Sequence, residues 1–538
     1  MEKNKTSTKY DTIVIGAGAG GLATAICLAR EGQRVLVLEQ HDVPGGWCHS
    51  FYLNGHRFTP GVHYVGLLGD GEATNDLYRG LEIANDLVFF RMNPDAYEHV
   101  HIGKARFDYP ANFEQLIHRL GESFPAEKKQ IDKYLRLVKK VSEELFSIPY
   151  IKGFWQKLTL PYRTRHFGRY ALFSLRKVIG WHVKDPLLKN ILNIQCGDHG
   201  VQPRKAAFPL HCALMNHYFQ GAYYPMGGGG ALVKSMTNTL KRYGGELRTS
   251  TEVQKILVQD GDEKKAIGVE LHDGSQIMAE TIVSNADPDI TYRKLIGKKN
   301  LSPKLQKKLE GTKYSCTSLM LFLTVATDVR RLGVDSGNIW MMPDMDADEH
   351  YDAALNNDIL KGEAFEGMFI SCTTLKDPTS YDGIHHCFEA ITFIDYSAFE
   401  NFKNENDIRS EAYVQFKAQL TEKMLNGMEK AIPGIKQHVV HVELGTPITN
   451  EYYINSTLGN VYGTEKTLKQ IGPFAYKAKS EIEGLYLCGA SILSHGVAGA
   501  SHSGVDTAAK ILGKHPDELK KPRDDQKLRI YEAETSTD

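Results

Sequence analysis

The chain has 538 residues, of which 42% are hydrophobic and 24% are charged, so it is long enough for two or three packed domains. Its formal net charge of -1 excludes a general nucleic-acid binder, which would carry a basic excess. The 8 cysteines include no CxxC pair, which argues against zinc and thioredoxin-like sites. No apolar run approaches the roughly 20 residues that span a bilayer, and no apolar signal region follows the polar N-terminus. We therefore expect a cytoplasmic protein without signal peptide or transmembrane helix, either free or peripheral on a membrane surface.

The N-terminal residues predict a βαβ unit. The apolar run TIVI at 12–15 indicates a buried strand, residues 22–30 have helical composition, and VLVL at 35–38 indicates a second buried strand. A strand, a glycine turn, a helix and a second strand within about 30 residues have the size of such a unit. The predicted fold class is therefore α/β, with a Rossmann-like domain at the N-terminus.

The turn after the first strand, GAGAGG, fits the dinucleotide-binding pattern GxGxxG. Gly16 permits a tight turn, Gly18 lets backbone amides approach a pyrophosphate, and Gly21 lets the helix pack close to the strand. Gly20 lies in the same turn and is also a candidate for cofactor binding. Glu39 ends the second strand, near where an acid must bond the ribose hydroxyls. The alternative, a glycine turn without a ligand, is disfavoured because strand, helix and acid all fall where required.

Position 39 bears on which cofactor binds. A Glu there suits FAD or NAD and argues against a ribose 2′-phosphate. The pair Gly45-Gly46 follows shortly after it. A second glycine pair at this place is a feature of flavin-binding families with two dinucleotide-binding domains, which the sequence resembles here. The resemblance implies that the cofactor is FAD.

Residues 110–195 are expected to be mostly helical, and residues 154–184 within them interleave aromatic rings with Lys and Arg. Rings at headgroup level beside cations that meet anionic lipid are typical of a membrane-surface element, so peripheral membrane contact through 154–184 is one interpretation. The other is a pair of helices whose aromatic side chains face the core. The rings concerned include Trp155, Tyr162, Phe167, Tyr170, Phe173 and Trp181.

The rest of the chain predicts further elements and ends in a charged, proline-containing segment from residue 515, which indicates a mobile tail. The predicted elements are a loop at 223–230 before a helix at 231–243, strands at 252–258 and 266–271, a mixed lobe at 300–450, and a strand, glycine-rich loop and helix that end at 505–512.

The segment GLYLCGASILSHGVAGASHSGVDTAAKIL resembles a strand, glycine turn and helix of the phytoene desaturase and amine oxidase group. In that group these elements bring backbone amides to the flavin ring and phosphate. The positions that match are Gly489, Val497, Ala498 and Gly499. Ala490 departs from the pattern, because many relatives have Asp there, and one polar contact to the cofactor is lost. The resemblance also implies that Val253 contacts adenine through its backbone.

Three further segments narrow the resemblance: GGWCHSFYLNGHRFTPGVHYVG, GVQPRKAAFPLHCALMNHYFQGAYYPMGGG and GTPITNEYYINSTLGNVYG. Together they resemble the all-trans-retinol 13,14-reductase (retinol saturase) and carotenoid isomerase branch of the phytoene desaturase-like flavoproteins, over residues 10–512. The resemblance implies a discontinuous FAD-binding domain with an inserted α+β substrate domain. The predicted parts are FAD-binding segments at 10–70, 206–298 and 471–514, a helical substrate- or membrane-facing region at 71–205, a substrate domain at 299–470 and a mobile tail at 515–538.

The implied activity is an FAD-dependent oxidoreduction of CH-CH groups in a hydrophobic polyene, with saturation of a C=C bond as the leading hypothesis. Saturation needs a hydride, which reduced flavin supplies, and a proton from a nearby acid. The candidate acids are His63 and Tyr64, which follow a glycine expected near the flavin, and His217 and Tyr218. The two histidines are the most easily tuned near neutral pH. The alternative for each of the four is a hydrogen-bonded core residue.

Four other functions use the same scaffold. A carotenoid cis-trans isomerase would lend electron density to the polyene while a bond rotates, and a phytoene-type desaturase would run the hydride toward oxidised flavin. An amine oxidase needs an aromatic cage that the sequence does not locate. A non-enzymatic prenyl- or lipid-binding protein of the GDP-dissociation-inhibitor fold is disfavoured by the near-intact C-terminal flavin loop. No second GxGxxG and no metal-ligand spacing appear, so the electron donor stays open and no metal is predicted.

Overall fold

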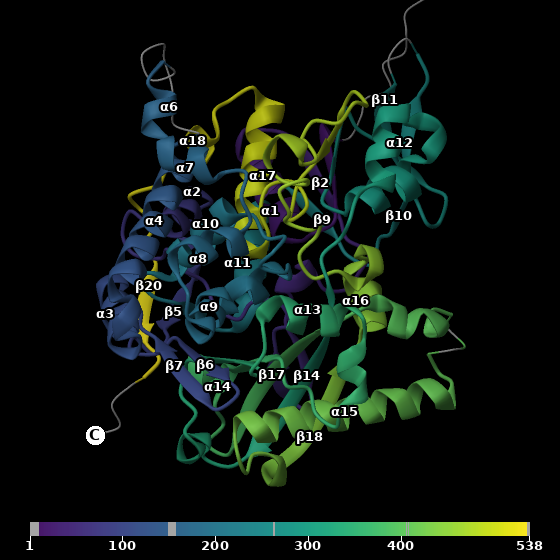
Figure 1. The fold of residues 1–538 in the computed structure, drawn as a ribbon. Helices are drawn as coiled ribbons and strands as arrows, with labels where there is room; N and C mark the ends of the chain where they lie inside the picture. Colours follow the sequence, from purple (N-terminus) through teal and green to yellow (C-terminus); the bar gives the residue numbers. More distant parts are fainter. Residues whose placement is uncertain (1–9, 149–157, 262–263, 405, 407, 535–538) are drawn as a thin grey trace, which may run out of the picture.

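The computed structural model describes residues 10–148, 158–261, 264–404, 406 and 408–534. Figure 1 shows two sheets, one above the other, with a lobe of helices along one side of both. Helices α1 (Ala19–Arg30) and α17 (Gly496–Leu512) pack on the upper sheet, and α15 (Glu411–Ala431) lies against the lower one (Figure 1). The predicted α/β class is confirmed.

The upper sheet is parallel, in the order β19-β13-β1-β2-β9. Its strands are β1 (Thr12–Ile15), β2 (Val35–Leu38), β9 (Glu246–Arg248), β13 (Thr281–Ser284) and β19 (Leu485–Leu487). The predicted strands at 12–15 and 35–38 are confirmed, and both are fully buried, as expected for apolar runs covered on both faces. Ile15 pairs with Leu38 and with Ser284, so the carboxyl ends of the strands meet at one edge.

Helices α1 and α17 cross in close contact because both carry glycine where they meet. A Cβ on Gly504 would lie 2.2 Å from the carbonyl oxygen of Gly20. Both helices begin earlier than the sequence predicts, at residue 19 rather than 22 and at residue 496 rather than 505. Glycine disfavours helix locally, and here the packing of one helix on the other outweighs that preference. Helix α11 (Gly228–Arg242) likewise begins inside its glycine run.

The lower sheet is mixed, in the order β18-β14-β17-β16-β15-β6-β7. Its strands are β6 (Glu98–Ile102), β7 (Ala105–Tyr109), β14 (Thr317–Ala326), β15 (Asn338–Met342), β16 (Met368–Cys372), β17 (His385–Ile394) and β18 (Val439–Gly445). The prediction that 71–205 is a helical region needs correction, because β6 and β7 come from it and β6 pairs with β15. Such long-range pairing leaves no local signal in the sequence.

The helical lobe packs its apolar faces against one another and against the lower sheet. In α4, Ile131, Leu135 and Val138 recur at helical spacing and are buried. The helices of the lobe are α3 (Phe113–Ser123), α4 (Lys128–Ser147), α6 (Leu160–Arg163), α7 (Arg165–Tyr170), α8 (Leu175–His182), α9 (Pro186–Asn193) and α10 (Phe208–Tyr218). The remaining helices are α2 (Ala73–Gly80), α12 (Pro303–Glu310), α13 (Ala347–Leu355), α14 (Thr373–Lys376) and α16 (Pro447–Ile454).

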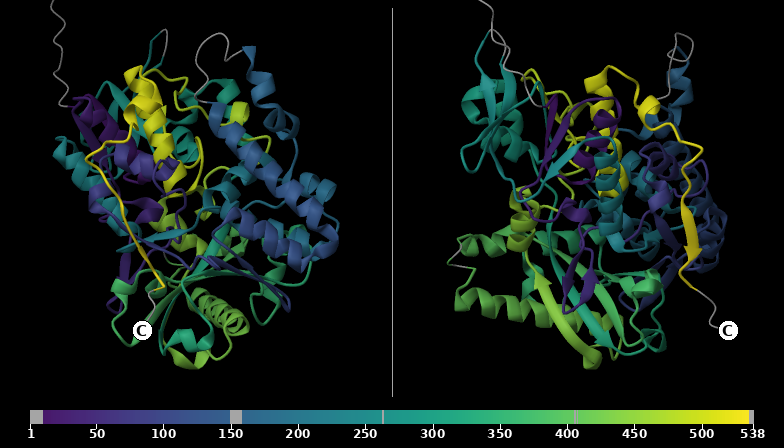
Figure 2. Two further views of the ribbon diagram at one scale, coloured as in Figure 1. Left: turned by 90° about the vertical axis from the view of Figure 1, so that its left-hand side faces the viewer. Right: turned by 180° about the vertical axis from the view of Figure 1, so that it is seen from behind.

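The C-terminal segment is not the mobile tail that its composition indicates. It forms α18 (Pro516–Leu519) and β20 (Arg529–Glu532), and β20 pairs in parallel with β5 (Val88–Arg91). Figure 2 shows the segment descending from α17 along the outside of the molecule. Backbone hydrogen bonds to β5, which propensity cannot reveal, hold it there.

Three small sheets complete the fold: β10 (Val253–Gln259) with β11 (Lys265–Leu271) and β12 (Gln276–Met278), β5 with β8 (Tyr223–Pro225) and β20, and the hairpin of β3 (Phe51–Leu53) and β4 (His56–Phe58). The predicted strands at 252–258 and 266–271 are confirmed within one residue. All eight cysteines are unpaired and buried. Within the described residues, no helix combines the length and the apolar character that crossing a bilayer requires.

Candidate active site

A cavity of about 1130 Å³ opens at the carboxyl edge of the parallel sheet, between it and the lower sheet. All the predicted cofactor-binding residues except Gly21, Ala498 and Gly499 line it. Those residues are Gly16, Gly18, Gly20, Glu39, Gly45, Gly46, Val253, Gly489, Ala490 and Val497. The structure therefore brings residues of the three predicted FAD-binding segments, which are far apart in the chain, to one cavity.

The first glycine turn is tight enough to exclude any larger side chain at two positions. A Cβ on Gly21 would lie 2.1 Å from the carbonyl oxygen of Gly16, and one on Gly20 would lie 2.9 Å from the Cα of Gly489. Gly18 is the N-cap of α1, and no side chain caps it. The backbone N–H groups at the start of α1 are thus available to an anion in the cavity.

Glu39 is held rigidly at the end of β2. Its Oε2 accepts a hydrogen bond of 2.8 Å from the backbone N–H of Ala17, and its Oε1 accepts one of 3.0 Å from the N–H of His41. The side chain is buried apart from its face on the cavity. A carboxylate fixed in this way presents its remaining lone pairs in a defined direction.

The second glycine pair lies against the first turn. Gly45 bridges to Gly18 in the manner of parallel strands, and a Cβ on Gly45 would lie 2.7 Å from Val233 of α11. Gly45 and Gly46 have φ values of 127° and 53°, which favour glycine. Gly499 differs from the others, because it packs on Ser494 rather than lining the cavity.

Two polar residues after β13 line the cavity, and the sequence analysis missed both. The Asn285 amide lies between the two glycine turns, where it is the nearest side chain to added Cβ atoms on both Gly18 and Gly489. Asp287 accepts hydrogen bonds from Asn460 Nδ2 (2.7 Å) and Ser491 Oγ (3.0 Å), and burial raises its pKa. Their signal was the motif SNADP, which places polar residues at the carboxyl end of a buried strand.

Lys466 lies behind the loop that carries Ala490, the position where many relatives are expected to have Asp. Its Nζ donates a hydrogen bond of 2.5 Å to the backbone carbonyl of Ala490. Burial lowers the pKa of Lys466 to about 8. Burial, followed by the charge of Lys466, lowers the pKa of His495 to about 3, so this cavity-lining imidazole is neutral.

One end of the cavity is lined mainly by apolar side chains, with the ion pair of Lys417 and Glu443 beside them. Its walls come from the hairpin β3–β4 and from strands β14, β17 and β18 of the lower sheet. The apolar lining residues there are Phe51, Leu53, Met320, Phe322, Ile391 and Leu444. A single cavity therefore has a polar, glycine-lined end and a mainly apolar end.

His63 lies at the boundary of this cavity and a second, smaller one of about 80 Å³. Its Nδ1 is 3.1 Å from Glu389 Oε2, within ion-pair distance but outside hydrogen-bond geometry. Its backbone carbonyl accepts a hydrogen bond of 2.7 Å from Lys376 Nζ. Lys376 is completely buried, and burial lowers its pKa to about 7.

Tyr64 lines the smaller cavity beside Asp198, and its hydroxyl meets two carboxyl groups. The oxygen lies 2.8 Å from Glu98 Oε1 and 2.7 Å from Asp198 Oδ2. A phenol carries one proton and can donate it to only one of them, so the other short contact needs a proton on the carboxyl side. Burial raises the pKa of Glu98 to about 7 and that of Asp198 well above its usual range. In the cluster of Tyr64, Glu98 and Asp198, one carboxyl group therefore stays protonated near neutral pH.

His217 and Tyr218, the other two candidate acids, line neither cavity in the described part of the chain. The Nε2 of His217 accepts a hydrogen bond of 2.8 Å from the backbone N–H of Gly66, and burial lowers its pKa to about 4. Tyr218 stacks on Tyr64 with ring centroids 4.3 Å apart. Both residues therefore support the segment that carries Tyr64, as in the alternative of a hydrogen-bonded core residue.

The parallel sheet, the glycine turn and the acid that ends β2 define a dinucleotide-binding protein. Comparison with known proteins gives its family. Residues 19–322 match the family described as flavin containing amine oxidoreductase. An oxidoreductase from Methanosarcina mazei superposes with a TM-score of 0.61 at 16% identity, over 94% of this chain and 100% of that chain. A putrescine oxidase superposes with a TM-score of 0.63 at 15% identity, over 94% and 99%.

Relatives match along nearly the whole chain. The all-trans-retinol 13,14-reductase of Macaca fascicularis is 30% identical over 534 residues, 95% of this chain and 87% of that protein. That of Danio rerio is 29% identical over 532 residues, with 94% and 86% covered. Prolycopene isomerase 1 of an Oncidium hybrid cultivar is 29% identical over 546 residues, with 97% and 86% covered. The chain belongs to the flavin containing amine oxidoreductase family and is an FAD-dependent oxidoreductase. The predicted family resemblance and the predicted cofactor are confirmed.

Proposed function

We propose that this protein reduces a C=C bond of a polyene isoprenoid, a retinoid or a carotenoid. The observation that carries the proposal is the continuity of one cavity from the glycine turns to the apolar wall formed by Phe51, Met320 and Phe322. Redox chemistry on a chain of conjugated double bonds needs a flavin and a long apolar substrate side by side. The names of the relatives, retinol 13,14-reductase and prolycopene isomerase, support this substrate class.

The residues of the cavity fit FAD. The N-termini of α1 and α17 both reach it, and neither has a side-chain cap or an acidic residue in its first turn, so both favour phosphate. We assign Gly18 and Gly20 to the pyrophosphate, Glu39 to the ribose and Val253 to the adenine. The turn from Gly489 to Val497, with Gly45 and Gly46 opposite, is assigned to the flavin end. FAD, when bound and reduced, supplies the hydride.

The protein itself supplies the proton in this proposal. Tyr64 Oη is the donor, and His63 forms the boundary between its cavity and the larger one. A proton that leaves Tyr64 is replaced from Glu98 or Asp198, because both carboxyl groups are hydrogen-bonded to the same oxygen. Stacked Tyr218 and the hydrogen bond from Gly66 to His217 fix the ring and its backbone.

A carotenoid cis-trans isomerase is the second candidate function, favoured by the isomerase relatives. It would use the same cavity without a net gain of hydrogen. A desaturase would remove hydrogen. The amine oxidase and the binding-only alternatives remain as outcomes of the same test.

The test is the product mass after anaerobic incubation of chemically reduced enzyme with retinoids and carotenoids. A product heavier by two hydrogens supports the reductase. A desaturase is tested by a parallel anaerobic incubation with oxidised enzyme, in which it would give a product lighter by two hydrogens together with reduced flavin. An unchanged mass with a new elution position supports the isomerase. Unchanged polyenes together with flavin that stays reduced would overturn the substrate class. In the parallel incubation with oxidised enzyme, reduction of the flavin by an added amine would point to an amine oxidase. Chemical reductant is used because the natural electron donor is open.

We further propose contact with an anionic membrane surface through α6–α8. Leu158, Tyr162, Leu172 and Trp181 expose 59%, 72%, 78% and 51% of their surface. Lys177 lies over the Trp181 ring at 5.7 Å. Other rings of the predicted element, Phe167, Tyr170 and Phe173, pack against the core. Trp155, part of the same prediction, lies outside the described residues.

Co-sedimentation with vesicles that contain anionic lipid tests the contact. Replacement of Tyr162, Leu172 and Trp181 by Ser is expected to abolish binding, because exposed rings and aliphatic side chains supply the insertion energy. The matched control replaces Val414 and Val440, which are equally exposed on the lower lobe. Equal binding by the triple variant and the control would overturn the proposal.

A further inference from the structure

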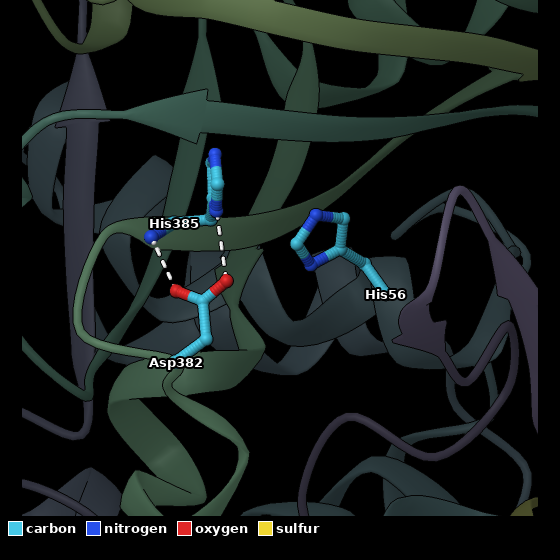
Figure 3. Close-up of side chains that lie close together, drawn as sticks. All are labelled: His56, Asp382 and His385. Atoms are coloured by element: carbon cyan, nitrogen blue, oxygen red, sulfur yellow. Dashed lines mark hydrogen bonds and ion pairs between the residues drawn. The ribbon is translucent and has the colours of Figure 1, made fainter.

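Three potential metal ligands converge where the hairpin β3–β4 meets the start of β17, and none of the three lines the large cavity. His56 begins β4, His385 begins β17, and Asp382 lies in the turn before β17. One nitrogen of each imidazole and one oxygen of the carboxylate all lie within 4.8 Å of one another. Figure 3 shows the His56 ring pointing toward the gap beside Asp382 and His385. Sequence spacing gave no sign of this cluster, because His56 is distant along the chain from the other two.

The carboxylate is already oriented. Asp382 Oδ1 accepts hydrogen bonds from the backbone N–H groups of Ile384 (2.9 Å) and His385 (2.7 Å), and its Oδ2 lies 2.8 Å from His385 Nδ1 (Figure 3). The nitrogens of His56 have no hydrogen-bond partner within the described residues. The ring lies edge-on to His385 with centroids 5.0 Å apart.

We propose that His56, Asp382 and His385 bind a divalent zinc ion that clamps the hairpin to the first residue of β17. Two imidazole nitrogens and one carboxylate oxygen are a zinc ligand set, and partial exposure leaves the fourth position to water. The ion would take the place of the proton between His385 Nδ1 and Asp382 Oδ2. Small rotations of three side chains bring the ligand atoms to tetrahedral spacing. No thiolate competes, because all eight cysteines are buried.

The clamp would act on the cavity wall. Phe51 and Leu53 of β3 line the apolar end of the large cavity, and Leu53 pairs directly with His56 of β4. The hairpin is otherwise held by Arg57, which donates a hydrogen bond of 2.6 Å to Asp377, and by Asn54, which meets His441. A metal bond at His56 would therefore stiffen one wall of the space assigned to the substrate. This consequence rests on the proposed function, whereas the metal site does not.

Zinc titration of the FAD-loaded protein by calorimetry, after treatment with chelator, tests the site. One ion per chain is expected. His56→Ala and Asp382→Asn each remove one proposed ligand of the zinc ion. Each should weaken zinc binding more than does the loss of a residue that only hydrogen-bonds to a ligand, which lowers metal affinity by roughly 10- to 100-fold. The control, His118→Ala, removes an exposed histidine on α3 that has an acidic neighbour, Glu122, and should bind as the wild type does.

Hydrogen exchange of the hairpin, with and without zinc, tests the clamp separately from any activity. Zinc should slow exchange of residues 51–58 in the wild type and leave it unchanged in His56→Ala. Wild-type affinity in His56→Ala, or binding without protection of the hairpin, would overturn the bridge. Because neither readout uses a substrate, failure of the metal site is distinguishable from failure of the proposed reductase activity.

Discussion

The hydroxyl oxygen of Tyr64 lies 2.7 Å from Asp198 Oδ2, and the two residues are 134 positions apart in the chain. The contact joins the segment after the hairpin to the segment after α9. With Glu98 on the same oxygen, it forms a buried group that retains an acidic proton at a pH where isolated carboxyl groups have lost theirs.

Tyr64→Phe should lower the rate of polyene reduction by roughly 100- to 10,000-fold, the range that loss of a general acid produces. The ring, its stack on Tyr218 and the FAD absorbance should be retained, because only the hydroxyl is removed. Single-turnover oxidation of the reduced flavin by a retinoid or carotenoid measures the rate. Tyr218→Phe is the control and should retain most of the activity. Equal rates in the two variants would remove Tyr64 from the reaction.

The contribution of Glu98 to the free energy of unfolding should fall as the pH rises. Burial raises the folded-state pKa of Glu98 from 4.5 to about 7, so the folded protein holds this proton more tightly than the unfolded chain does. The stability from this proton is fully present below pH 4.5 and is lost as the pH rises through 7, by roughly 3 kcal/mol in total. Urea unfolding at pH 5 and pH 7.5 measures it. The buried histidines, whose pKa values are lowered, titrate in the wild type and in the variant alike. The free energy of unfolding of Glu98→Gln relative to the wild type should therefore rise between pH 5 and pH 7.5, whereas that of Glu310→Gln, on an exposed side chain, should not; a constant difference for Glu98→Gln would contradict the assignment.

Gly21→Val should abolish FAD binding. The added Cβ would lie 2.1 Å from the carbonyl oxygen of Gly16, so α1 must move away from β1 and the turn must open. Flavin content after purification and the melting temperature report the two effects. Gly180→Ala, in an open position on α8, should keep a full complement of flavin. A yellow Gly21→Val protein with wild-type content would show that the turn does not need close packing.

Glu39→Gln should weaken FAD binding by roughly 10- to 100-fold, because hydrogen bonds to a charged group contribute about 1.5 to 3 kcal/mol. The amide keeps the shape of the side chain but only one acceptor for the two backbone N–H groups of Ala17 and His41, so the melting temperature is measured beside the affinity to separate a local change of fold from the loss of charge. Quenching of flavin fluorescence during titration of the flavin-free protein gives the affinity. Glu31→Gln, which removes a surface partner of Lys514, serves as the control. Unchanged affinity in Glu39→Gln would place the ribose elsewhere.

The N-terminal βαβ unit was predictable because its signals are local. Apolar runs mark β1 and β2, and the glycine spacing between them has one well-known geometric use. Gly489 was expected in the same site as Glu39 because its segment resembles the phytoene desaturase and amine oxidase group. The structure adds a general reason, since the carboxyl ends of parallel strands meet at one edge of the sheet. Asn285 follows the same rule and was missed only because β13 itself was not predicted.

The proton-bearing cluster was half predicted. His63 and Tyr64 follow a glycine motif, but Glu98 and Asp198 lie in regions expected to be helical and carry no motif of their own. Their meeting depends on β6, which joins the lower sheet through β15. Side-chain pairing across such distances is fixed by tertiary packing, and no window of sequence contains it. The same reason explains why His217, adjacent to Tyr218 in a conspicuous motif, is a backbone partner of Gly66 instead.

The crossing of α1 and α17 brings the ends of the chain together, with Thr24 Oγ1 donating a hydrogen bond of 3.0 Å to the carbonyl of Gly504 across 480 positions. Contacts between residues so far apart in the chain form late in folding, because the entropy cost of closing the long loop comes before the contact can stabilise the fold. During synthesis, the contact between the first glycine turn and α17 can form only after α17 has left the ribosome. FAD therefore meets a complete binding site only after α17 has formed, and a protein truncated before residue 496 would lack the part of that site that α17 and the loop before it supply.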